Sequence, residues 1–119
     1  MQDIKEAIIS FHYAERIKSE LIIAAKLIDH VGFMSDEECS GAEKLLLFFL
    51  QVLLGEILIA RNASGMNAME EARLNLEESI QRVRLRDYDK AVRMISSAIT
   101  SATTGGEKAA VMLKERGLI

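Results

Sequence analysis

The chain has 119 residues, a length that suggests a single domain. Half of the residues are apolar and none is proline, a composition that favours long helices joined by short glycine, asparagine and serine turns. The net charge of −3 does not favour nucleic acid as a partner of the chain as a whole. The single cysteine, Cys39, excludes an internal disulfide and predicts a reducing, cytoplasmic location.

The first predicted helix covers residues 3–31, where apolar residues recur at alternating spacings of three and four. This periodicity places the recurring residues on one face of a helix, which is expected to be buried. The predicted buried residues are Ala7, Phe11, Ala14, Ile17, Leu21, Ala24, Ile28 and Val31. Gly32 follows directly and is expected to end the helix.

The second predicted helix covers residues 35–61 and begins at Ser35, which forms a capping box with Glu38. Its second half is apolar nearly all round, which is typical of a helix that is buried on nearly all sides. A membrane span is not expected here, because a span needs about 20 mostly apolar residues. The apolar run is 16 residues at most, and Glu56 lies inside it.

Two further helices are predicted over residues 67–86 and 88–103 from their apolar periodicity. The glycine pair at 105–106 is expected to break the chain before a last short helix over 107–116. The predicted fold class is therefore all-α. We expect one domain over residues 1–119, a helical bundle of four to five helices around a highly apolar central second helix.

Residues 68–103 resemble a single helical hairpin of the tetratricopeptide type, as found in small archaeal helical proteins of unknown function. The resemblance is carried by Asp87-Tyr88 at the turn and by small or apolar residues on both sides of it: Ser79, Ala91, Ile95, Ala98 and Ile99. The sequence departs from the repeat at Glu78 and Arg82, where the repeat usually has large apolar or aromatic residues. The resemblance implies a hairpin packing mode and a protein-binding role, and it implies no activity.

Glu56 is the candidate for a buried polar residue, because its helical neighbours three and four positions away are apolar. A carboxylate in such a place either pairs with a cation or serves as an acid or a ligand. One functional alternative is therefore a metal or catalytic bundle that uses Glu56 with His12 or His30. The Glu-x-x-His pattern of di-iron bundles is absent. We predict no catalytic residue, metal or cofactor, and expect the protein not to be an enzyme.

A basic cluster surrounds the turn between the third and fourth predicted helices. Its members are Arg82, Arg84, Arg86, Lys90 and Arg93. Such a cluster can hold the phosphates of a nucleic acid or an acidic partner. A small nucleic-acid-binding module is therefore the other functional alternative, although charge runs are usually solvated helix faces.

The function that the sequence favours is a non-enzymatic interaction or scaffold protein that self-associates. A bundle of this size offers few surfaces to cover a helix that is apolar all round, and large exposed apolar patches normally mark interfaces. Two-fold dimers are the commonest assemblies. The predicted interface residues are Leu46, Phe49, Leu50, Leu53 and Ile57. An unknown protein partner is possible in place of a second copy.

Overall fold

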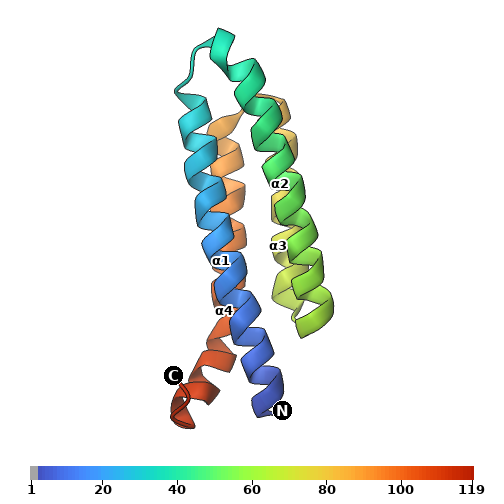
Figure 1. The fold of residues 1–119 in the computed structure, drawn as a ribbon, viewed down its shortest axis with the longest axis vertical. Coiled ribbons are helices and arrows are strands. Elements are labelled where there is room, and N and C mark those ends of the chain that lie inside the picture. The colour runs from blue at the N-terminus through green and yellow to red at the C-terminus, as the bar shows by residue number, and fades with distance from the viewer. Residues whose placement is uncertain (1–2) are drawn as a thin grey trace.

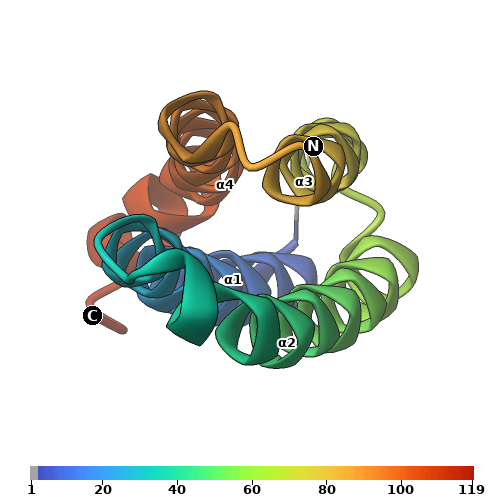
Figure 2. The same cartoon turned by 90° about the horizontal axis from the view of Figure 1, so that it is seen from above.

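A computed structural model describes residues 3–119; residues 1 and 2, which the predicted domain includes, lie outside the described part. The described residues form an all-α bundle. Its helices are α1 (Ile4–Gly32), α2 (Asp36–Ser64), α3 (Asn67–Arg84) and α4 (Tyr88–Glu115). They run antiparallel in chain order and give an elongated body of 53 × 22 × 18 Å (Figure 1). Seen from above, α1 and α2 form one layer and α4 and α3 the other (Figure 2).

The helix ends follow from local hydrogen bonding. Asp3 and Ser35 each form a capping box, in which the cap side chain accepts a hydrogen bond from a backbone N–H three residues on. The capping box predicted at Ser35 is confirmed. Gly65 ends α2 in the left-handed conformation, with φ at 68°. Gly32 is the last residue of α1 rather than the residue beyond it.

The prediction of separate helices over residues 88–103 and 107–116 is wrong, because α4 continues through Gly105 and Gly106. Both glycines lie where another helix comes close. A Cβ atom added to Gly106 would lie 2.6 Å from the Cβ of Ala14, and one added to Gly105 would lie 2.5 Å from the Cβ of Ala68. The glycine pair therefore serves close helix packing and does not break the helix.

The core lies on the inward faces of all four helices. The buried face predicted for α1 is confirmed except at Phe11, which is half-buried. Helix α4 makes the most extensive backbone contacts, first with α1 and then with α3. Small residues on α4 allow this approach, because Ala91, Ala98, Ala102 and Ala109 are fully buried. Helix α2, predicted to be the central helix, contacts its neighbours less extensively than α4 does and presents large side chains to them.

Helices α3 and α4 form an antiparallel hairpin. The Ser79 hydroxyl donates a hydrogen bond of 2.9 Å to the carbonyl of Ala91, so this buried serine ties the two helices together. Asp87 caps α4 by accepting a hydrogen bond from the backbone N–H of Lys90. Glu78 and Arg82, where the sequence departs from the tetratricopeptide pattern, form an ion pair of 2.8 Å along α3.

A candidate interaction face on helices α1 and α2

The outward side of α2 is uncovered and carries several large apolar side chains. Within the bundle α2 packs against α1 on one side and α3 on the other, so no described element lies over its outer surface. Leu45 is 72% exposed, Phe48 is 68% exposed and Val52 is 50% exposed. Large side chains with this much contact to water are individually ordinary, but a contiguous group of them is typical of an interaction site.

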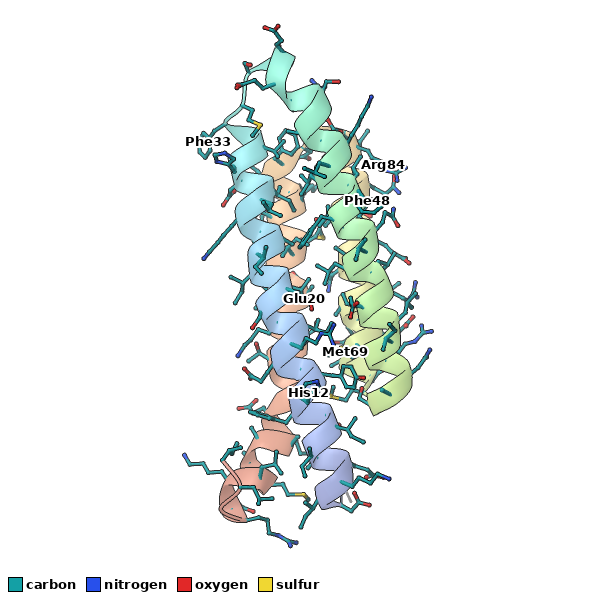
Figure 3. The ribbon with its side chains drawn as sticks, in the orientation of Figure 1. His12, Glu20, Phe33, Phe48, Met69 and Arg84 are labelled. Carbon is teal, nitrogen blue, oxygen red and sulfur yellow. The ribbon has the colours of Figure 1, made fainter. Side chains whose placement is uncertain are left out.

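Helix α1 extends this apolar surface. Its residues Ile23 and Leu27 are 49% and 39% exposed and lie beside α2. A groove of about 480 Å³ runs between the two helices, and its lining is almost wholly apolar. We define the outer face as Ile23, Leu27, Leu45, Phe48, Phe49 and Val52. Figure 3 looks onto this side of the bundle, with Phe48 labelled on α2.

Ion pairs border the outer face toward the start of α1. Arg16 donates hydrogen bonds to Glu20 at 3.1 Å and to Glu56 at 2.8 Å. The Glu56 side chain is 30% exposed, so it reaches the rim of the bundle and is paired. Glu56, predicted as a buried polar residue, is therefore only half-buried, and its carboxylate pairs with a cation, which is one of the alternatives that the sequence left open. Proximity to Glu20 and Glu56 raises the pKa of Arg16, which keeps this border charged.

The residues predicted as the interface lie elsewhere. Leu46, Leu50, Leu53 and Ile57 are at most 4% exposed and form the core beneath α2, while Phe49 is half-buried at the groove. A second copy cannot reach four of the five, so this residue assignment is corrected. The reason is that α2 carries two apolar lines, and the packing of α1 and α3 decides which one turns inward. The exposed line, Leu45, Phe48, Val52 and Ile59, has spacings of three, four and seven residues, which also place its members on one face of the helix.

The histidines and Glu56 are not gathered into one site. His12 lines a hollow beside the C-terminal end of α4, whereas His30 lines the groove at the opposite end of α1. Glu56 lines neither of these places, although its ion-pair partner Arg16 lines the hollow beside His12. Among residues 3–119, no three or more His, Cys, Asp or Glu side chains come together in a way that could hold a metal ion. The metal or catalytic alternative therefore has no such cluster to support it among the described residues, and it stays a prediction.

The predicted basic cluster is partly neutralised. Arg82 pairs with Glu78, and Arg86 pairs with Glu43 of α2 at 3.2 Å. Arg84, Lys90 and Arg93 are exposed at this end of the bundle. Binding of nucleic acid by these residues stays a prediction, and two of its five cations already have a carboxylate partner within the chain.

The single cysteine lies at the same end, in the first turns of α2. Cys39 is 4% exposed, and its Sγ atom is 3.0 Å from the Tyr88 hydroxyl, with which it shares a hydrogen bond. Burial and this hydrogen bond raise the pKa of Tyr88. The contact joins α2 to the start of α4, which indicates a structural role for the thiol.

A second ion-pair network joins α2 to α3 at the other end. Glu70 accepts hydrogen bonds from Arg73 on its own helix and from Arg61 of α2, the latter at 2.7 Å. Arg73 and then Arg61 lower the pKa of Glu70 to about 2. Arg73 also pairs with Glu77. Because these charged side chains pair with one another within the chain, we interpret the network as a contact that stabilises the packing of α2 against α3.

No helix among residues 3–119 has both the length and the hydropathy needed to cross a membrane. Comparison of the chain with family models, curated proteins and solved structures gave no match. The case for function therefore rests on the outer face and its surroundings.

Proposed function

We propose that this chain is a non-enzymatic interaction protein that self-associates through the outer face of α1 and α2. The observation that carries the proposal is the exposure of Leu45, Phe48 and Val52 beside an apolar groove. Fully burying an exposed side chain of this size is worth about 1.5–3 kcal/mol, and these three side chains keep half or more of their surface exposed in a single bundle. Association with a second copy would bury these side chains and gain that free energy.

The size of the available surface supports a second copy as the partner. A helix of 29 residues is about 43 Å long, and the bundle is about 20 Å wide. The outline of the α1–α2 layer is therefore roughly 860 Å². A standard interface, with roughly 800 Å² of accessible surface per partner, fits within this layer. The charged border at Arg16, Glu20 and Glu56 fits the polar rim that surrounds such interfaces.

The solution mass across a dilution series tests this proposal. We expect light scattering of the concentrated protein to give twice the chain mass of 13.3 kDa. The mass should fall toward one chain on dilution, because a reversible dimer dissociates by mass action once the protein concentration falls below its dissociation constant. A mass of one chain at every concentration up to the millimolar range would refute self-association and point to an unlike partner.

A further inference from the structure

We infer that two copies pair through α2 in an antiparallel arrangement, about a two-fold axis that passes beside the level of Leu50. This inference rests on the proposed self-association and adds its geometry. It names the residues of each copy that face each other and the point where the two backbones come closest.

The inference starts from one continuous line along α2. Its members are spaced by four, three, four, three and four residues: Gly41, Leu45, Phe48, Val52, Gly55 and Ile59. With 3.6 residues per turn, all six positions fall within about 40° of one direction. All six are exposed, whereas Leu50, half a turn away, is fully buried. Alternating spacings of three and four residues are typical of the contact line between two helices that pack side by side, as in a coiled coil.

The line is self-complementary when it is reversed. In an antiparallel pair with its axis beside position 50, residues equally far before and after that position face each other. Phe48 then faces Val52 of the other copy, and Leu45 faces Gly55. Gly41 faces Ile59 in the same way. A parallel pairing would instead place Phe48 against Phe48 and Gly55 against Gly55. The two phenylalanines would crowd each other, and the two glycines would leave a gap.

The two glycines supply an independent observation. A glycine inside a helix destabilises it relative to alanine, so its presence calls for a packing reason. In α4 that reason lies within the chain, since Gly105 and Gly106 receive Ala68 and Ala14. A Cβ added to Gly41 or Gly55 would meet no atom within 4 Å. The antiparallel pair provides the missing reason, because a large side chain of the second copy lies against each glycine.

Disulfide trapping tests the arrangement. One chain carries Leu45→Cys and another carries Gly55→Cys, both in a Cys39→Ser background so that no other thiol is present. We expect oxidation of the mixture to give a mixed disulfide in high yield. Neither chain alone should cross-link. In an antiparallel pair of two identical variants, the two introduced cysteines lie ten helical residues apart along the axis, which is about 15 Å. A disulfide needs Cα atoms within about 7 Å.

A second mixture, of Phe48→Cys and Val52→Cys chains, reports the layer next to the axis and serves if Gly55→Cys weakens association. Light scattering of the reduced Cys39→Ser protein separates the possible failures. The antiparallel register is overturned, and self-association stands, if the protein is a dimer but neither mixture forms a mixed disulfide. The same holds if the Leu45→Cys chain forms a disulfide with itself, as a parallel pair would. A Cys39→Ser protein that keeps its helical signal and the mass of one chain refutes the proposed function itself.

The substitution Gly55→Leu is expected to stabilise the single chain and to weaken the dimer. The single chain should resist urea better, since leucine favours the helix and the site is open. Dimerisation should weaken about tenfold to a hundredfold, because the added side chain holds the two backbones apart. Stronger or unchanged dimerisation contradicts the assignment of Gly55 to the contact.

Discussion

The substitution Val52→Arg is expected to give a folded single chain. Val52 is 50% exposed at the middle of the outer face, so an arginine there can extend into water and approach Glu56 one turn away. In the dimer the same arginine would be buried against apolar side chains, twice by symmetry. Removing the water around this charge costs several kcal/mol, so we expect the dissociation constant to rise at least about 100-fold.

The matched control is Val111→Arg. Val111 is a valine of nearly equal exposure, 52%, but it lies on α4 and outside the outer face. Sedimentation velocity should show one chain for Val52→Arg and the wild-type mass for Val111→Arg, with equal helical circular dichroism for both. If the two variants sediment alike, the outer face is not where the copies meet.

Replacement of Gly106 by leucine is expected to have the largest effect on folding. The position faces Ala14 across the contact between α1 and α4, and even a single added carbon would come within 2.6 Å of the Ala14 Cβ. Because the contact is made by a short side chain fixed to the backbone, the helices must move apart. We expect a loss of about 3 kcal/mol in the free energy of unfolding.

Gly41→Leu is the control for this substitution, because a Cβ at Gly41 meets nothing within 4 Å. In the Val52→Arg background, which removes association, Gly41→Leu should raise the free energy of unfolding by up to about 1 kcal/mol. Urea unfolding followed by circular dichroism measures both variants. Equal midpoints for Gly106→Leu and Gly41→Leu would show that the glycine pair is not a packing device.

Much of the fold follows from local patterns. The capping box at Ser35 and the apolar line of α1 each depend on neighbours within a few residues, so the sequence predicts them well. The helix break predicted at residues 105–106 is wrong because the sequence does not distinguish a glycine that ends a helix from one that allows another helix to pack closely. Only the arrangement of α1 beside α4 distinguishes these two uses.

The candidate site was harder to predict than the fold. Helix α2 has apolar residues all round, so its pattern does not say which of its two lines faces the core. The choice of Leu50 and Leu53 over Phe48 and Val52 as buried residues is made by the positions of α1 and α3. Glu56 could be recognised as needing a partner, but Arg16 is 40 positions away and only the fold brings it near.

Protection of one phenylalanine relative to another would test most directly whether a second copy covers the outer face. Phe33, at the end of α1, is 90% exposed and lies outside that face, whereas Phe48 is 68% exposed within it. After hydroxyl-radical labelling of the concentrated protein, we expect Phe33 to be modified freely and Phe48 to be protected. Modification of Phe48 should rise on dilution and in the Val52→Arg variant. If Phe48 is labelled as freely as Phe33 at every concentration, the outer face is open to water and no second copy covers it.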